Sequence, residues 1–378
     1  MNKTPQNQSQ KKRNNESLLA VLLVLLVFFL GVLIATLFSG ALQRQPVDTT
    51  QPTTSTTGGG SENEDPGIDP SLYNPVFSGG VVPTTLPIAN DQTVELGSEI
   101  YSQYAVLIDV QSNTVLAGKG ADTQMSPASM TKVMTLIVAC EKLTQYDLTQ
   151  RMTLNEYYNN YNYNGLDVGL IDGTKYLGDT FYIKDLLYGV GMASAADCVL
   201  MIAERTYGTM DAFVAAMNEK ARVLGLTQTY FVDASGDELG NVTTAKEMAV
   251  IMAYAMQCPL ICEILGEDEH VYSGYWIKDG VDTAYNRQFS SHLLSKTNQS
   301  SRLKRYEDKY GAFVLATCKD LIGKTGYLDK PDRSYLVCSV TGRVSGHTYV
   351  AVVGENTGTD IFANTLRDAK ILFDTYAK

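Results

Sequence analysis

Histidine and cysteine are scarce in this chain of 378 residues, which has three of the former and six of the latter. It contains no Cys-x-x-Cys pair and no His-Glu-x-x-His segment, so the ligand spacings of a structural zinc site and of a zinc peptidase are both missing. Basic residues are outnumbered, because 30 Lys+Arg stand against 41 Asp+Glu and give a net charge of -11. This balance argues against binding to nucleic acid through its phosphates.

Charged residues are absent from residues 18–38, an apolar run about as long as the ~20 residues that a helix needs to cross a membrane. Basic residues precede this run at positions 3, 11, 12 and 13, and only Arg44 follows it closely. The positive-inside rule therefore predicts a cytoplasmic tail at 1–17, a transmembrane helix at 18–38 and an extracytoplasmic remainder, as in a single-pass protein of the cell membrane. The alternative is a signal peptide that is cleaved near Ser39, Gly40 and Ala41.

Residues 39–95 are rich in Thr, Gly, Pro, Ser and acidic residues, and they contain no Lys or Arg after Arg44. Such a composition buries too little apolar surface to offset the entropy of ordering, so it predicts a linker. Only the part around Tyr73 to Pro87 has the aromatic and aliphatic residues to fold onto a domain. Because 44% of the chain is hydrophobic, a large globular domain is expected at 96–378.

The order of the expected elements indicates an α+β domain. Strong β-formers predict a hairpin over 104–110 and 114–118, and apolar residues at helical spacing predict a helix over 128–143. Further helices are expected at 183–190, 195–207, 210–224 and 244–256, followed by strands at 335–340 and 347–354 and a helix at 362–376. Thr243 or Thr244 would open the helix at 244–256, with Glu247 in a capping box. This order predicts one antiparallel sheet built from both ends of the domain, flanked by helices, with an inserted all-helical region.

Ser129 and Lys132 place a hydroxyl and an amine three residues apart at the start of a predicted helix, so both project from one face. A serine hydroxyl needs a base to become nucleophilic, and a lysine held neutral by its surroundings can be that base. The helix dipole would also favour negative charge at the serine. The alternative for the same residues is a capping serine followed by a solvated lysine.

Two further positions carry chemically useful side chains. Lys324, Thr325 and Gly326 offer a cation, a hydroxyl and a residue without a side chain, which along an edge strand would bind the carboxylate of an extended peptide. The alternative is a tight turn with a surface lysine. Ser194 lies just before the helix predicted at 195–207 and would by default be its N-cap.

Taken in order, three segments closely resemble the three motifs of penicillin-recognising serine acyl-transferases: PASMTKVMT at 127–135, LLYGVGMASAADC at 186–198 and IGKTGY at 322–327. The segment FVAAMNEKARVLGLTQTYFVDASG at 213–236, with Thr243 to Ala249 after it, resembles the D-alanyl-D-alanine carboxypeptidase branch of that group. The resemblance covers about residue 99 to the C-terminus. It implies a β-lactamase/transpeptidase-like fold.

The resemblance also implies a role for each matching residue. Ser129 would be the acylated nucleophile and Lys132 its general base. Ser194 would relay a proton to the departing D-alanine, and Lys324 would tune that relay. Hydrolysis of the acyl-enzyme would release a peptidoglycan stem peptide shortened by one D-alanine, and β-lactam antibiotics would be covalent inhibitors. No metal or other cofactor is implied, because acyl transfer by these groups needs none.

The third motif would bind the substrate. Thr325 would help to hold the terminal carboxylate of the peptide, and Gly326 would leave room for the peptide backbone. The backbone N–H groups of Ser129 and Tyr327 would form the oxyanion hole.

One residue departs from the family pattern. The second motif is usually Ser-x-Asn, but Ala196 stands at its third position, so the amide that would bond to Lys132 and to the substrate is missing. Losing such a preorganised partner can cost on the order of 10²-fold or more in rate. The sequence therefore leaves open a cell-wall binding protein with impaired catalysis and, as a third reading, a β-lactamase.

Some polar and cysteine-containing segments allow two interpretations. Tyrosines and asparagines alternate through 157–164, where they would line a groove for glycan or stem peptide, or form a solvated loop. Cys140 and Cys198 are expected in the core as small apolar residues. A bridge between Cys258 and Cys262 requires the preceding helix to end near Pro259.

Overall fold

The computed structural model describes residues 69–155, 176–294, 302–311, 319–330, 333–356 and 359–378. The predicted tail at 1–17, the predicted transmembrane helix at 18–38, most of the predicted linker and the Tyr/Asn run at 157–164 lie outside these residues. Among the described residues, no single helix has both the length and the apolar character required to cross a membrane.

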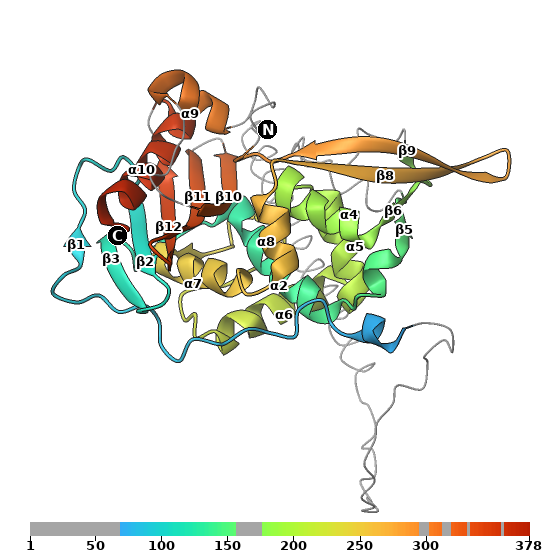
Figure 1. Ribbon diagram of the computed structural model, residues 1–378, viewed down its shortest axis with the longest axis horizontal. Helices are drawn as coiled ribbons and strands as arrows, with labels where there is room; N and C mark the ends of the chain where they lie inside the picture. Colours follow the sequence, from blue (N-terminus) through green and yellow to red (C-terminus); the bar gives the residue numbers. More distant parts are fainter. Residues whose placement is uncertain (1–68, 156–175, 295–301, 312–318, 331–332, 357–358) are drawn as a thin grey trace, which may run out of the picture. The chain divides into compact units, whose positions relative to one another are not determined.

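A six-stranded sheet is the centre of the fold, and both ends of the globular domain contribute to it (Figure 1). Across the sheet its strands are β1 (Val94–Glu95), β3 (Thr114–Lys119), β2 (Tyr104–Asp109), β12 (His347–Asn356), β11 (Arg333–Val344) and β10 (Lys319–Lys330). Val106 of β2 lies opposite Val352 of β12, which joins the predicted hairpin to the last strand. All pairs are antiparallel except β1 with β3. The predicted sheet from both ends of the domain is thus confirmed.

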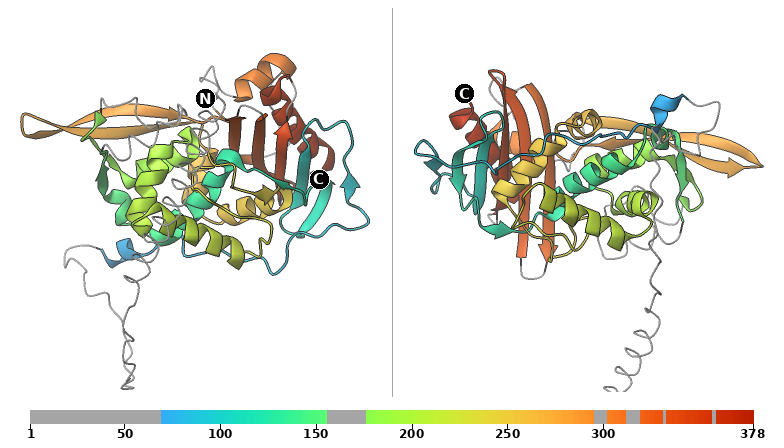
Figure 2. Two further views of the ribbon diagram at one scale, coloured as in Figure 1. Left: turned by 180° about the vertical axis from the view of Figure 1, so that it is seen from behind. Right: turned by 90° about the horizontal axis from the view of Figure 1, so that it is seen from below.

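The two faces of the sheet bury different sets of residues, as the two-residue period of a strand requires. Val106 and Val352 point into the larger core, which contains the helical part of the domain. Leu107 and Ala351 point to the other side, where the C-terminal helix α10 (Ile361–Tyr376) covers the sheet. Helix α9 (Arg302–Tyr310) packs on α10. The sheet is therefore covered by helices on both faces (Figure 2).

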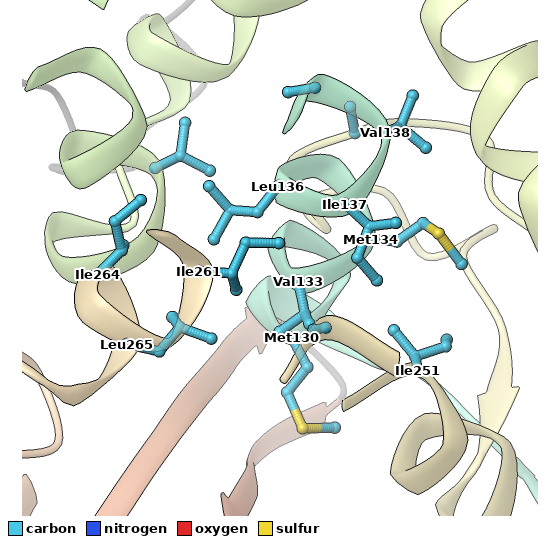
Figure 3. Close-up of a cluster of buried hydrophobic side chains, with 14 of the residues drawn as sticks. Met130, Val133, Met134, Leu136, Ile137, Val138, Ile251, Ile261, Ile264 and Leu265 are labelled. Carbon is cyan, nitrogen blue, oxygen red and sulfur yellow. The ribbon is translucent and has the colours of Figure 1, made fainter. Parts of the chain in front are cut away.

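Helix α2 (Thr131–Lys142) runs through the larger core, with ten consecutive residues buried from Thr131 to Cys140. A helix that is buried all round must have neighbours on every side. Figure 3 shows Val133 and Leu136 facing Ile261 and Ile264 of α8 (Pro259–Gly266). Ile251 of α7 (Ala245–Ala255) lies on another side. Because α2 has so many neighbours, its first turn is a rigid place for a functional group.

Three further helices lie near the predicted positions, and two sheets were not predicted. The helices are α4 (Ile183–Tyr188), α5 (Ala196–Tyr207) and α6 (Met210–Val223). The second sheet contains β5 (Arg151–Thr153), β6 (Thr180–Tyr182), β8 (Glu269–Lys278) and β9 (Val281–Ser290). Its long β8–β9 hairpin extends away from the helices (Figure 1) and is largely exposed, so its sequence has little of the apolar alternation that marks a half-buried strand. A short pair of strands, β4 (Gln124–Met125) and β7 (Thr243–Thr244), completes the described sheets.

Two smaller expectations can be compared with the structure. Cys140 and Cys198 are buried core residues as predicted, whereas no disulfide joins Cys258 to Cys262, although a helix does begin at Pro259. The later part of the linker packs on the domain, because Phe77 is buried and its N–H donates to the carbonyl of Cys140.

The start of α7 confirms half of the predicted capping box. Thr244 is the N-cap, and its hydroxyl accepts the backbone N–H of Glu247 at 3.0 Å. The carboxylate of Glu247 does not return to the cap. It accepts instead from the backbone N–H of Gln228 at 3.0 Å and from the hydroxyl of Thr229 at 2.6 Å. Glu247 therefore ties α7 to the segment that follows α6.

Replacing the capping hydroxyl of Thr244 should destabilise the domain. We expect Thr244→Ala to lower the free energy of unfolding by about 1 kcal/mol, since one N–H at the helix start loses its acceptor. Thr244→Ser keeps the hydroxyl and should lose less. Chemical denaturation of both variants beside the parent chain measures the difference, and equal losses in the two variants would contradict a role for the hydroxyl.

Candidate active site

Ser129 lies on a 3₁₀ turn, Ala128–Met130, directly before α2. Ala128 has φ of 45°, a left-handed conformation that costs energy in a residue with a side chain. Gly236 approaches the same residue so closely that a Cβ at 236 would lie 1.9 Å from the carbonyl oxygen of Ala128. The turn that presents the hydroxyl of Ser129 is therefore held by a loop from a distant part of the chain.

Lys132 extends from the first turn of α2 back toward this hydroxyl. Its Nζ lies 3.0 Å from Oγ of Ser129 and donates to the backbone carbonyl of Ser235 at 2.5 Å. The side chain is almost fully buried, with only 1% of the residue exposed. The predicted contact between hydroxyl and amine is therefore present in the structure. The burial of Lys132 excludes the alternative of a solvated lysine.

The surroundings of Lys132 favour its neutral form. Burial lowers the pKa of its amine below the ordinary value of 10.5, because a charged group is poorly solvated in the interior. The carboxylates of Asp237 and Asp233 act in the opposite direction and raise that pKa. A lysine with a lowered pKa is able to accept the proton of a neighbouring hydroxyl.

The loop that contains Ser235 is fixed along one side of α2. Its Ala234 carbonyl accepts from the hydroxyl of Thr135 at 2.6 Å. Nδ2 of Asn241 donates to the hydroxyl of Thr131 at 3.1 Å, while its Oδ1 accepts the backbone N–H groups of residues 232 and 233. Sequence analysis did not identify Ser235 or Asn241, although the Asp-Ala-Ser-Gly segment at 233–236 is a recognisable turn signal.

Ser194 and Lys324 form a second pair. Nζ of Lys324 donates to Oγ of Ser194 at 2.9 Å and to the carbonyl of Thr325 at 2.8 Å, and both side chains are buried. The expectation that Ser194 caps the following helix is wrong, because Ala195 is the N-cap of α5. Ser194 instead ends a π-helical turn, Gly189–Ala193, with φ of 59°. This conformation places the hydroxyl of Ser194 next to the amine of Lys324.

Strand β10 brings the two pairs to one place. It is the last described strand at one end of the six-stranded sheet and passes the turn that contains Ser129. A Cβ at Gly326 would lie 2.8 Å from the backbone nitrogen of Ser129, so only glycine permits this approach. Lys324 is two residues away on the same face of the strand, a separation of about 7 Å. The structure thus brings Ser129, Lys132, Ser194 and Lys324 together.

The other two residues of the third motif differ in their surroundings. Thr325 is buried, and within the described part of the chain its hydroxyl has no hydrogen-bond partner. A buried polar group without a partner is costly unless a ligand completes it. Tyr327 is half-buried, and its ring packs 5.7 Å from that of Phe362 on α10. Tyr327 follows Gly326 directly, so its backbone also passes close to the turn of Ser129.

Ala196 is the first residue of α5 and is buried. Its methyl group offers no hydrogen bond at the position where the family pattern has an amide. The next residue, Asp197, accepts the backbone N–H of Cys198 at 2.7 Å and so serves the start of its own helix. The site therefore contains a nucleophile with a neighbouring base and a second hydroxyl with a neighbouring cation, a set that can carry out acyl transfer.

Known proteins similar to this chain are D-alanyl-D-alanine peptidases. D-alanyl-D-alanine carboxypeptidase DacF of Bacillus subtilis is 27% identical over 239 residues, which cover 58% of this chain and 59% of that protein. DacC of Escherichia coli is 33% identical over 169 residues, which cover 43% and 41%. The D-alanyl-D-alanine endopeptidase of Escherichia coli is 28% identical over 244 residues, which cover 62% and 70%. The chain thus spans less than two thirds of the length of the first two relatives.

Solved structures agree with the fold. The Streptomyces K15 DD-transpeptidase aligns with a TM-score of 0.57 at 21% identity, over 73% of this chain and 97% of that chain. The likeness shows the α+β fold of the penicillin-binding peptidases. The family described as D-alanyl-D-alanine carboxypeptidase, peptidase S11, matches residues 90–301, more than half of the chain. The chain therefore belongs to the D-alanyl-D-alanine carboxypeptidase family of serine peptidases.

Proposed function

We propose that this protein is a membrane-anchored D-Ala-D-Ala carboxypeptidase that removes the terminal D-alanine from peptidoglycan stem peptides through an acyl-enzyme. The observation that carries this proposal is the pairing of Ser129 with buried Lys132, beside the pairing of Ser194 with Lys324 on an edge strand. Family membership and the carboxypeptidase relatives support the same activity.

Acylation would begin with proton transfer from Ser129 to the neutral amine of Lys132. Oγ of Ser129 then attacks the carbonyl carbon of the penultimate D-alanine and forms a tetrahedral intermediate. The backbone N–H groups of Ser129 and Tyr327 stabilise its oxyanion. The C–N bond breaks as Ser194 gives its proton to the departing amine, and Ser194 recovers a proton from the protonated base.

The third motif would bind the C-terminal end of the substrate. The extended peptide would lie along the outer edge of β10, where no other described strand pairs, and its backbone would form a strand-like pairing there. Lys324 supplies positive charge, and Thr325 offers a hydroxyl without a partner in the described structure. A terminal carboxylate satisfies both. Water then hydrolyses the ester at Ser129 and regenerates the enzyme.

The membrane topology is part of the proposal. Residues 1–17 would form the cytoplasmic tail, 18–38 the transmembrane helix, 39–95 the linker and 96–378 the extracytoplasmic catalytic domain. The support is the charge-free run after basic residues 3, 11, 12 and 13. This topology places the active site on the side of the membrane where peptidoglycan lies, and β-lactams would be its covalent inhibitors.

Ala196 favours a second candidate function. Without the amide of the family pattern, the protein would bind stem peptides in the same site and turn them over slowly or not at all. This candidate shares the fold and the substrate with the first. The two differ only in whether D-alanine is released.

A labelled penicillin should acylate Ser129. We expect mass spectrometry of the full-length chain in detergent to find the adduct on the peptide that contains residue 129, and Ser129→Ala to carry none. Ser112→Ala, at an exposed turn, is the control for substitution of a serine. An unlabelled parent chain with a normal thermal transition would refute the acyl-enzyme.

The rate of this acylation should rise with pH, because the reactive form of Lys132 is the neutral amine. The pKa of that amine lies below 10.5, so the midpoint of the rise should also lie below 10.5. Lys132→Arg keeps a cation that cannot lose its proton, and we expect acylation to slow by about 10²- to 10⁴-fold. Stopped-flow labelling across pH measures both effects. A pH-independent rate in the parent chain would contradict the role of Lys132.

Restoring the amide of the second motif separates the two candidate functions. If the protein is a carboxypeptidase limited by Ala196, we expect Ala196→Asn to raise the rate of D-alanine release from a model pentapeptide by about 10- to 100-fold. Ala196→Ser, which adds a polar group without the amide, is the control. Tight binding of the pentapeptide with no release in any of the three chains would favour the binding protein.

A further inference from the structure

We propose that Asp237, which lies outside the three motifs, is a positioning residue during acyl transfer: Ser235 fixes its carboxylate, and the negative charge of that carboxylate acts on the amine of Lys132. This inference rests on the proposed function. It addresses what replaces the missing amide at position 196, since Lys132 is the group that this amide would have contacted.

A continuous chain of contacts joins Asp237 to the nucleophile. Oδ2 of Asp237 accepts from the hydroxyl of Ser235 at 2.8 Å. The carbonyl of Ser235 accepts from Nζ of Lys132 at 2.5 Å, and the same Nζ lies 3.0 Å from Oγ of Ser129. Asp237 therefore fixes the residue that supplies the backbone acceptor of Lys132.

The position of Asp237 relative to the nucleophile is also fixed by the backbone. Gly236, its neighbour in the chain, has φ of 86° and contacts the backbone of Ala128, the residue before Ser129. This contact leaves no room for a Cβ. Asp237 therefore stands one residue from a close junction between the loop and the turn of Ser129.

The two carboxylates of this loop have different tasks. Asp233 is buried and accepts the backbone N–H groups of residues 235 to 238, as well as Nδ2 of Asn241 at 3.2 Å. Those donors compensate its charge and show that it holds the loop together. The carboxylate of Asp237 is half-buried, and among the described residues its one side-chain hydrogen bond comes from the hydroxyl of Ser235. Asp237 is thus the carboxylate whose charge is least compensated by the loop itself.

Charge near Lys132 decides how readily it gives up its proton. Among the described residues that exert an electrostatic effect on its amine, Asp237 has the largest and Asp233 the next. Other ionisable groups on elements packed against α2 are engaged elsewhere: Lys324 with Ser194, Asp197 with Cys198, and Glu247 with Gln228 and Thr229. Burial alone would make Lys132 a weak base. Asp237 offsets part of this lowering of the pKa, and it would thereby make the amine a stronger acceptor for the proton of Ser129.

The test is the pH dependence of penicillin acylation in the full-length chain with Asp237→Asn. Asparagine keeps an oxygen that can accept from Ser235 and removes only the charge. We expect the acidic limb of the acylation profile to move to lower pH by about 0.5 to 1 pH unit, because loss of a nearby negative charge lowers the pKa of Lys132. At the foot of that limb, this shift is an increase of about three- to tenfold in rate.

Two controls make the shift specific. Glu238→Gln removes the exposed carboxylate next in the chain and should leave the midpoint where it is. Asp237→Glu restores the charge and should return the midpoint toward that of the parent chain. An unmoved midpoint in Asp237→Asn, or an equal shift in Glu238→Gln, would overturn the proposal. Loss of acylation at every pH in Asp237→Asn, with a normal thermal transition, would overturn it as well.

A second measurement does not depend on turnover. The ¹⁵Nζ resonance of Lys132, assigned by its absence in Lys132→Arg, reports the titration of the amine directly. We expect this titration to move to lower pH in Asp237→Asn, and an unmoved titration would overturn the inference. If the parent chain shows the expected titration but is never acylated by penicillin, the proposed function fails while the effect of Asp237 on Lys132 stands.

Discussion

A lysine amine in the interior beside a serine hydroxyl is the constraint on which the site depends. Burial of Lys132 requires a compact polar environment, because an unpaired amine in an apolar core is costly. The Ser235 carbonyl and the hydroxyl of Ser129 meet that requirement. The loop from Asp233 to Asn241 is fixed to α2 for the same reason, since its backbone provides the acceptor.

Two close approaches of the backbone fix the turn of Ser129 relative to the rest of the site. Gly236 contacts the turn of Ser129 from the loop, and Gly326 contacts it from the sheet. Neither position has space for a methyl group. Within the sheet, β2 pairs with β12, and this pairing joins the N-terminal and C-terminal parts of the domain. The turn of Ser129 is therefore held between the loop of Gly236 and a sheet whose strands are far apart in sequence.

The sequence was sufficient for the order of elements and for the three motifs, because these depend on local patterns. Hydrophobic spacing identified α2, and turn residues identified the β2–β3 hairpin. It was not sufficient for the β8–β9 hairpin, whose strands are mostly exposed and so lack an apolar period. It also assigned Ser194 to a cap, since the π-helical turn before it depends on tertiary packing. Ser235 and Asn241 were not predicted, because one acts through its backbone carbonyl and the other through contacts with distant residues. No short sequence pattern indicates such contacts.

The position of β10 as the outermost described strand of its sheet has a consequence for selectivity. Unpaired backbone groups on an outer strand attract any extended segment, including the edge of another copy of the chain. The buried ammonium group of Lys324 and the lack of a side chain at Gly326 narrow that choice, because both suit a short guest that terminates in negative charge. A long uncharged strand would offer no negative charge to Lys324. The same edge would therefore favour the C-terminal end of a peptide over an internal extended segment.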